Sequence, residues 1–235
     1  YYLVKKSVDE QMVVDVSVGF FLSGGMDSST VVALASKNHN DINTFSIGFT
    51  DESHDETHFA ELIADMYKTK HHKEILDENI TKGMFHKIKE WYDEPFGDTS
   101  CFPTYMVSKL AKENSTVVLT GDGGDEVFGG YNWYKRFENL QKHSLSSLRF
   151  LKVFTRPLKK QNNILGKVAR RIEGQFLLDD LELYTRLMGG MLKDEKEKYK
   201  KLWGIDESYD DYWYFKKFYK KNLDIYTRLQ YLDFH

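Results

Sequence analysis

Residues 16–29 read VSVGFFLSGGMDSS, and this stretch decides the fold of the first half of the chain. The apolar run over 16–22 is rich in β-branched and aromatic residues, as is typical of a strand buried in a parallel sheet. It ends at Ser23, Gly24 and Gly25, and a helical pattern over 28–36 follows. Because glycine lets the backbone turn tightly and approach a ligand closely, we predict a strand, a ligand-binding loop and a helix.

The same two kinds of segment alternate as far as residue 120. Further strands are predicted over 44–49, 70–75 and 117–120. Helices are predicted between them over 55–66, 79–90 and 103–113, the last with Pro103 at its first position. Strands that alternate with helices form a parallel sheet, and ligands bind such a sheet beyond the carboxyl ends of its strands.

The second half carries no comparable strand pattern. Helices are predicted over 131–142, 178–191 and 210–232, whereas the basic stretch 144–166 has no clear period and receives no assignment. We therefore expect an α/β core over residues 1–131 and a helical extension of the same domain over residues 132–235.

Composition narrows the class of protein. Of the 235 residues, 41% are hydrophobic and 15% aromatic, which is enough for a packed core. Apolar runs fall short of the roughly 18 residues that a membrane helix needs. A single cysteine, Cys101, excludes an internal disulfide and suits a reducing compartment. We expect a cytoplasmic protein that has no membrane partner.

Charge is divided unequally along the chain. Residues 1–130 hold 11 lysines against 22 acidic residues, whereas residues 131–235 hold 22 basic and 14 acidic residues. An acidic half is a poor surface for nucleic acid but a good one for Mg²⁺. Lysines interleave with aromatic residues over 209–221, which we assign to a core or helix interface, so no nucleic-acid partner is predicted.

The loop SGGMDSS over 23–29 has the features of an anion site. A helix N-terminus presents free N–H groups, and the serine hydroxyls add donors. Asp27 would repel a phosphate there unless Mg²⁺ bridged the carboxylate to phosphate oxygens. The alternative is a tight turn in which Asp27 only caps the helix.

A second acidic loop, LTGDGGDEVFGGY, spans residues 119–131. Three carboxylates lie within five residues, at Asp122, Asp125 and Glu126. Such a cluster is costly unless a metal or a cationic ligand neutralises it. A polar loop or a weak calcium site is the alternative, although the spacing does not fit a calcium-binding loop.

Histidines could indicate zinc at His54, His58, His71 and His72. Adjacent residues on a strand point to opposite faces, and no cysteine or HExxH pattern accompanies them. We therefore do not assign a zinc site. Cys101 is interpreted as a packed thiol rather than a nucleophile.

Together the two loops resemble the asparagine synthetase family, specifically its ATP-pyrophosphatase domain, which has the adenine nucleotide α-hydrolase or PP-loop fold. Segments 93–96 (DEPF) and 103–105 (PTY) are also similar to that family, so the resemblance runs from about residue 18 to residue 131. SGGxDS alone would be shared with GMP, NAD and argininosuccinate synthetases and with tRNA-modifying enzymes. The second motif, GDGGDEVFGGY, favours the asparagine synthetase family over these other enzymes.

This resemblance implies a carbon–nitrogen ligase that uses ATP and Mg²⁺. The aspartate side chain would attack the α-phosphorus of ATP to give β-aspartyl-AMP and pyrophosphate, and ammonia would then displace AMP to give asparagine. Aspartate and ammonia are the implied substrates, and the full-length chain would carry a glutaminase domain that supplies the ammonia. A homodimer is compatible with this interpretation.

The resemblance also assigns residues by position. Pyrophosphate would be held by Ser23, Gly24, Gly25, Ser28 and Ser29. Magnesium would be held by Asp27 and Asp125. The AMP pocket would be lined by Leu22, Ile47, Thr120 and Gly121. Asp122 would lie near the acyl adenylate, where the family has an acidic residue.

Two departures from the family bear on activity. Glutamine-dependent members begin with a catalytic cysteine, whereas this chain begins with Tyr1 and ends at His235. We therefore expect a piece truncated at both ends, which does not hydrolyse glutamine and is slow or inactive with ammonia. Two alternatives stay open, namely a relative that adenylates another carboxylate and a non-catalytic nucleotide-binding fragment.

Overall fold

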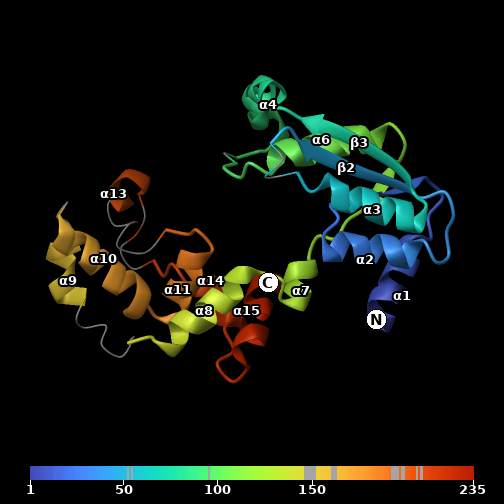
Figure 1. Cartoon of the computed structure of the whole chain (residues 1–235). Coiled ribbons are helices and arrows are strands. Elements are labelled where there is room, and N and C mark those ends of the chain that lie inside the picture. Colours follow the sequence, from blue (N-terminus) through green and yellow to red (C-terminus); the bar gives the residue numbers. More distant parts are fainter. Residues whose placement is uncertain are drawn as a thin grey trace. The chain divides into compact units, whose positions relative to one another are not determined.

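The computed structural model describes residues 1–51, 53, 55–94, 96–145, 152–159, 163–191, 196, 199–204, 206 and 209–235. The chain forms two compact units, residues 1–123 and residues 124–235 (Figure 1). Within the described residues, no helix has both the length and the apolar character needed to span a membrane.

The first unit is built on a four-stranded sheet in the order β3-β2-β1-β4. Its strands are β1 (Val18–Phe21), β2 (Asn43–Phe49), β3 (Lys70–Leu76) and β4 (Val117–Leu119). Every pairing is parallel, and Phe20 at the centre lies opposite Thr44 on one side and Leu119 on the other. The predicted α/β class with a parallel sheet is confirmed.

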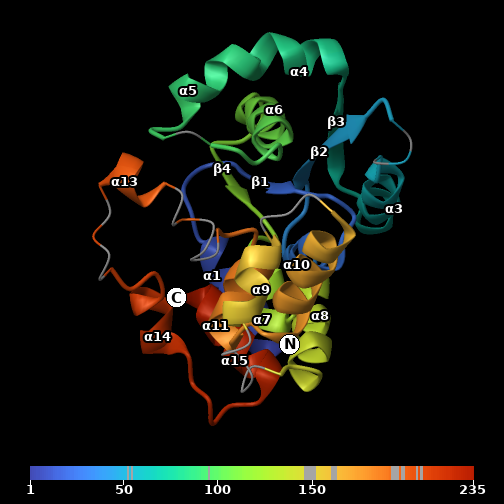
Figure 2. The ribbon, with the colours of Figure 1, turned by 90° about the vertical axis from the view of Figure 1, so that its left-hand side faces the viewer.

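Helices cover both faces of this sheet. The helices of this unit are α1 (Tyr2–Gln11), α2 (Met26–Ala35), α3 (Thr57–Tyr67), α4 (Glu78–Met84), the 3₁₀ helix η1 (Phe85–Lys87), α5 (Ile88–Trp91) and α6 (Cys101–Lys112), and α4 and α5 lie beyond α6 rather than on the sheet (Figure 2). Right-handed crossovers place α2 and α3 on one face and α6 on the other, because the chain reverses its direction across the sheet after β3 (Figures 1 and 2). The first loop and its helix thus emerge at the carboxyl end of the central strand.

Two predictions in this unit need correction. The helix expected over 79–90 is divided into α4, η1 and α5, so the apolar spacing there does not belong to one straight helix. Helix α6 begins at Cys101, which makes Pro103 its third residue rather than its first. Proline is tolerated there because the first helical turn leaves its N–H groups without intrahelical partners.

Among its described residues, the second unit contains helices joined by loops and no strand. Its helices are α7 (Gly124–Phe128), α8 (Asn132–Lys142), α9 (Lys152–Lys159), α10 (Ile164–Phe176), α11 (Asp180–Leu187), α13 (Lys200–Trp203), α14 (Trp213–Phe218) and α15 (Ile225–Phe234). Tyr134, Phe137 and Leu229 are fully buried at its centre. The predicted helical second part is confirmed.

The single helix predicted over 210–232 is wrong. The chain forms α14 and α15 instead, and Asp224 begins α15 by accepting a hydrogen bond from the Thr227 N–H at 3.1 Å. An aspartate in that position favours a new helix start over a continuous helix. The basic stretch 144–166 contains α9 and the start of α10, which lie side by side (Figure 2); residues 146–151 and 160–162 are outside the described part.

Candidate active site

The loop between β1 and α2 can be built only with glycine at residue 24. Gly24 has a φ of +81°, and a Cβ added there would lie 2.5 Å from the Cβ of Phe59 on α3. Either feature alone disfavours any other residue. The loop therefore packs directly on α3, which places Ser23 and Gly25 at the carboxyl end of β1.

Serine hydroxyls bond to one another inside this loop. Ser23 Oγ and Ser28 Oγ are 3.0 Å apart, and the Gly25 N–H donates to Ser23 Oγ at 3.2 Å. The Ser23 N–H donates to Ser28 Oγ, also at 3.2 Å. Ser28 Oγ also lies 3.3 Å from the Gly25 carbonyl as a donor. Each hydroxyl carries one O–H, so a bond between Ser23 and Ser28 uses one of their two donors and leaves one hydroxyl to donate elsewhere.

Ser29 differs from the other serines. Its Oγ is buried, and it has no hydrogen-bond partner among the described residues. A buried hydroxyl without a partner costs free energy, and such an atom needs a physical reason. Because Ser29 stands in the first turn of α2, where free N–H groups favour an anion, a phosphate oxygen is the partner that this position fits.

Part of the acidic loop approaches the same helix end. A Cβ on Gly121 would lie 2.6 Å from the backbone nitrogen of Ser28, so only glycine lets β4 exit so close to the start of α2. Thr120 Oγ1 accepts a hydrogen bond from the Asp122 N–H at 3.2 Å, and Asp122 is exposed. Within the first unit, both glycine-rich sequences thus meet at the N-terminus of α2.

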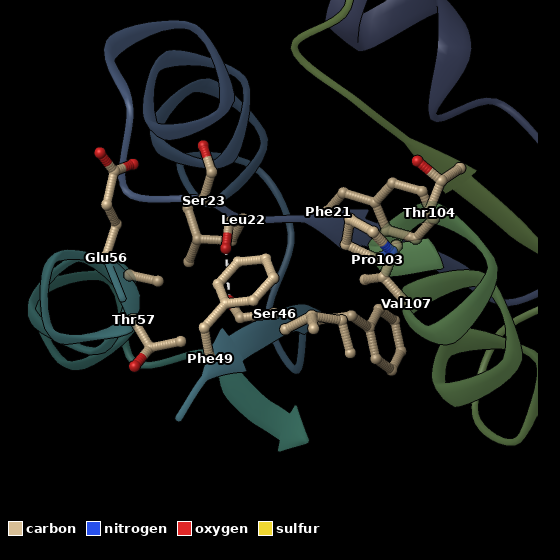
Figure 3. Close-up of a pocket in the computed structure, with 13 residues that line it drawn as sticks. Phe21, Leu22, Ser23, Ser46, Phe49, Glu56, Thr57, Pro103, Thr104 and Val107 are labelled. Carbon is tan, nitrogen blue, oxygen red and sulfur yellow. Dashed lines mark hydrogen bonds between the residues drawn. The ribbon is translucent and has the colours of Figure 1, made fainter. Parts of the chain in front are cut away.

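A pocket of about 240 Å³ opens beside this loop, over the ends of β1 and β2 (Figure 3). Its walls come from β1, β2, the start of α3 and the start of α6. The lining residues are Phe21, Leu22, Ser23, Phe45, Ser46, Ile47, Phe49, Glu56, Thr57, Ala60, Pro103, Thr104 and Val107. Most are apolar, as is usual for pockets that bind small molecules.

Three of the predicted site residues, Leu22, Ser23 and Ile47, line this pocket, whereas Thr120 and Gly121 do not. The sequence analysis missed Glu56 and Thr57 as lining residues. They follow β2 at its carboxyl end, so the rule that ligands bind beyond strand ends could have identified them. The PTY segment at Pro103 was noted for its family resemblance, and its first two residues are in the wall.

Hydrogen bonds fix two of these walls. Ser46 Oγ donates to the Leu22 carbonyl, which ties β2 to the end of β1 (Figure 3). Asp55 accepts from the Thr57 N–H at 3.1 Å and from the Thr57 hydroxyl at 3.0 Å. These bonds stabilise the charged carboxylate and lower the pKa of Asp55. Thr57 is therefore held in place at the start of α3.

In the second unit, Asp125 lies at the start of the short helix α7. Its carbonyl accepts hydrogen bonds from the Gly129 N–H at 2.8 Å and the Gly130 N–H at 3.1 Å. A Cβ on Gly130 would lie only 1.9 Å from Asp125 Oδ1, so the carboxylate rests directly on that glycine. The adjacent Glu126 accepts from the Tyr131 hydroxyl at 2.6 Å, and this bond raises the pKa of Tyr131.

The available carboxylates fit one kind of metal site. The described residues contain no group of three or more His, Cys, Asp or Glu side chains that could cage a metal. Mg²⁺ does not need such a cage, because it binds through one or two carboxylates together with phosphate oxygens and water. Asp27 in the first unit and Asp125 in the second are each half-buried carboxylates of that donor class. In the first unit, the unpartnered Ser29 hydroxyl fits a phosphate oxygen.

Comparison with known proteins shows which family this chain resembles over most of its length. The family model described as asparagine synthase matches residues 1–234. A putative glutamine-hydrolyzing asparagine synthetase 2 of Methanocaldococcus jannaschii is 43% identical over 169 residues, which are 68% of this chain and 32% of the relative. The glutamine-hydrolyzing asparagine synthetase 1 of Bacillus subtilis is 39% identical over 129 residues, which are 55% of this chain and 20% of the relative.

Among solved structures, NMN synthetase from Francisella tularensis has a TM-score of 0.40 at 16% identity and covers 86% of this chain and 90% of its own. The chain spans about a third or less of the length of the two curated relatives above. Because the family match extends over almost every residue, the resemblance stated from the two loops is confirmed: the chain belongs to the asparagine synthase family.

Proposed function

We propose that this chain is the ATP-dependent, amide-forming part of an asparagine synthetase. Aspartate attacks the α-phosphorus of ATP, pyrophosphate leaves, and ammonia then displaces AMP from β-aspartyl-AMP to give asparagine. The observation that carries the proposal is the buried, unpartnered hydroxyl of Ser29 at the start of α2, within the loop that Gly24 permits. Family membership supports the same chemistry.

The loop would hold the leaving pyrophosphate. Ser29 Oγ and the backbone N–H groups after Gly25 are the proposed donors at this helix end, and the Ser23 and Ser28 hydroxyls would donate to the anion by exchanging the bonds that they make within the loop. Pyrophosphate gains negative charge as the bond to the α-phosphorus breaks, so fixed donors at this end stabilise the transition state more than the ground state. Bound Mg²⁺ would supply charge neutralisation for the phosphates, with Asp27 and Asp125 as its proposed ligands.

The pocket beside the loop would hold the nucleoside. Leu22 and Ile47 offer apolar walls next to Ser23, and we assign the adenine ring to this space. Thr120 and Gly121 remain assigned to the AMP site because Gly121 packs against the same helix end. Asp122 is proposed to act near the acyl adenylate, either by orienting it or by accepting a proton from ammonia.

The names of the two relatives suggest a source of ammonia. Both curated relatives are glutamine-hydrolyzing enzymes, so we propose that a glutaminase domain of the whole protein supplies ammonia to this part. Cys101 is not the glutaminase nucleophile in this proposal, because it is buried in the first unit.

Ser29→Ala tests the proposal directly. We expect Mg-ATP affinity, measured by isothermal titration calorimetry, to fall roughly tenfold or more, because a hydrogen bond to a charged group contributes about 1.5–3 kcal/mol. The ligand-free variant should melt no lower than the unmodified chain, because the substitution removes a buried donor that has no partner.

Ser36→Ala is the matched control. It removes the same hydroxyl from the other end of α2, where Ser36 Oγ donates to the Val32 carbonyl at 2.7 Å. The control should leave Mg-ATP affinity unchanged. The proposal fails if the unmodified chain shows no saturable binding at millimolar Mg-ATP, or if both variants bind as well as it does.

A further inference from the structure

Helix α7 is too short to hold its own position. It spans only Gly124–Phe128, and an isolated helix of this length is unstable in water. Side-chain bonds from described residues outside the helix help to hold it. Tyr131 donates its hydroxyl to Glu126 Oε1 at 2.6 Å, and Gln230 donates from Nε2 to the Val127 carbonyl at 2.7 Å.

The second bond is different in kind from the first. Tyr131 follows the helix directly, whereas Gln230 is 103 residues away in the sequence, on α15. The Val127 carbonyl belongs to the last turn of α7, where a helix leaves its carbonyls without intrahelical partners. The Gln230 amide thus donates a hydrogen bond to a carbonyl that α7 leaves unpaired, and this bond joins α7 to α15.

The helix that carries Gln230 is fixed in the core of the second unit. Its neighbours on α15, Leu229 and Leu232, are 0% and 3% exposed. Asp233 on the same helix accepts hydrogen bonds from the Tyr134 hydroxyl at 2.5 Å and the Tyr184 hydroxyl at 2.7 Å. Because these contacts come from α8 and α11, α15 cannot shift without disturbing the core of the second unit.

The position of α7 determines where the Asp125 carboxylate points. Asp125 is two residues before Val127, and its carbonyl receives the Gly129 and Gly130 N–H groups. Its Oδ1 lies against Gly130 at a distance that leaves no room for a side chain there. A rotation or fraying of this single turn would therefore displace the carboxylate from that glycine.

We propose that Gln230 is a positioning residue for Asp125: its amide fixes the last turn of α7 and so keeps the carboxylate in the arrangement that accepts a divalent cation with ATP. The inference rests on the proposed function, in which Asp125 is a magnesium ligand. Gln230 itself touches neither the metal nor the nucleotide in this proposal. Its effect reaches them only through the Val127 carbonyl.

The test compares Gln230→Met with the unmodified chain. Methionine has a similar length and no donor, so it removes the bond to Val127 with little change in volume. Calorimetry should show Mg-ATP binding about fivefold weaker, because a typical hydrogen bond contributes about 1 kcal/mol, which is about fivefold in an equilibrium constant. The apparent affinity falls with the population of the competent form. Affinity for AMP without metal should not change.

Tyr226→Phe is the control on the same helix. It removes the bond from the Tyr226 hydroxyl to Glu138 Oε2 at 3.1 Å and does not touch α7. Both affinities should match those of the unmodified chain. Gln230→Glu is a second variant of the same shape, in case the methionine variant does not fold; it places an acceptor against the Val127 carbonyl and should weaken Mg-ATP binding at least as much.

The outcomes separate the two proposals. If the unmodified chain binds no Mg-ATP, the proposed function fails and this inference fails with it. If the unmodified chain binds Mg-ATP and both folded Gln230 variants bind it equally well, only the inference fails. Equal weakening of Mg-ATP and metal-free AMP would also overturn it, because a merely structural role affects both ligands alike.

Discussion

The two units hold their carboxylates by different means. In the first unit, hydrogen bonds between residues close in sequence, such as Ser23 with Ser28, shape the loop before Asp27, and close backbone packing at Gly24 and Gly121 fixes its place. In the second unit, the helix that carries Asp125 is held by a bond between Gln230 and Val127, which are 103 residues apart, and α15 is anchored by Tyr134 and Asp233, which are 99 residues apart. The first arrangement depends on backbone geometry at glycines, and the second depends on side-chain bonds between distant residues.

This difference determines which substitutions each unit tolerates. The loop in the first unit fails when its backbone geometry is violated, because a side chain at Gly24 would meet α3 directly. A site held by distant partners fails gradually, because each bond contributes only part of the support. The predictions below test this contrast, from the largest expected effect to the smallest.

Gly24→Ala should have the largest effect. The substitution combines a left-handed backbone with a Cβ placed 2.5 Å from Phe59, and we expect a loss of about 2–4 kcal/mol in unfolding free energy. Urea denaturation followed by circular dichroism measures it. Gly123→Ala separates the two causes, because Gly123 has a φ of +84° with nothing within 4 Å, and it should lose only about 1 kcal/mol.

Equal losses in the two glycine variants would show that crowding against α3 contributes nothing. The first loop would then be defined by backbone strain alone, and the close packing of Gly24 on Phe59 would not explain its position. If Gly24→Ala kept the unfolding free energy of the unmodified chain, both explanations, backbone strain and the clash with Phe59, would be wrong.

The parts of the fold that could be predicted from the sequence are those determined by residues close together in the chain. Alternating strand and helix patterns predicted all four parallel strands. The two glycine-rich sequences were predicted to follow strand ends, and both begin directly after strands, β1 and β4. Each signal depends on periodicity or on backbone freedom within a few residues, and both can be recognised in a single sequence.

Other features could not be predicted for a physical reason. The pocket is lined from β1, β2, α3 and α6, and which of their side chains face it depends on packing rather than on any one segment. The break between α14 and α15 was missed because aromatic residues continue on both sides of it, and the Asp224 cap was not recognised. Gln230 gave no signal because its partner is 103 residues away.

Tyr184→Phe tests the second unit at an intermediate level. It removes one oxygen atom, the donor to Asp233 Oδ1 at 2.7 Å, and leaves a half-buried carboxylate with one fewer partner. We expect a loss of about 2 kcal/mol in unfolding free energy, the usual contribution of a hydrogen bond to a charged group. Urea denaturation at neutral pH measures it.

Tyr134→Phe removes the other donor to the same carboxylate, and the double variant completes a thermodynamic cycle. The two losses should not add, because both hydroxyls serve one charge. Simple additivity would indicate that Asp233 does not link the two tyrosines, and the anchoring of α15 would then depend on its leucines alone.

The smallest expected effect is a change in how the free energy of unfolding depends on pH. His71 in the first unit and Asp233 in the second should change this dependence in opposite directions. Burial lowers the pKa of His71 in the first unit, where its Nδ1 is 2.9 Å from Thr44 Oγ1 and its Nε2 is buried without a partner among the described residues. The unfolded chain therefore binds a proton at His71 more readily than the folded chain. Stability from this residue is complete above the ordinary histidine pKa of 6.5 and is lost as the pH falls towards the folded value.

Asp233 in the second unit behaves in the reverse way. Burial raises its pKa above 3.8, although the tyrosine hydroxyls act against the shift. The folded chain then binds the proton more readily, so stability from this group is present at low pH and is lost as the pH rises through the folded pKa. In urea denaturation between pH 4 and pH 7, His71→Gln should lessen the loss of stability on acidification, and Asp233→Asn should increase it. If both variants changed the slope in the same direction, the opposite burial effects assigned to the two units would be wrong.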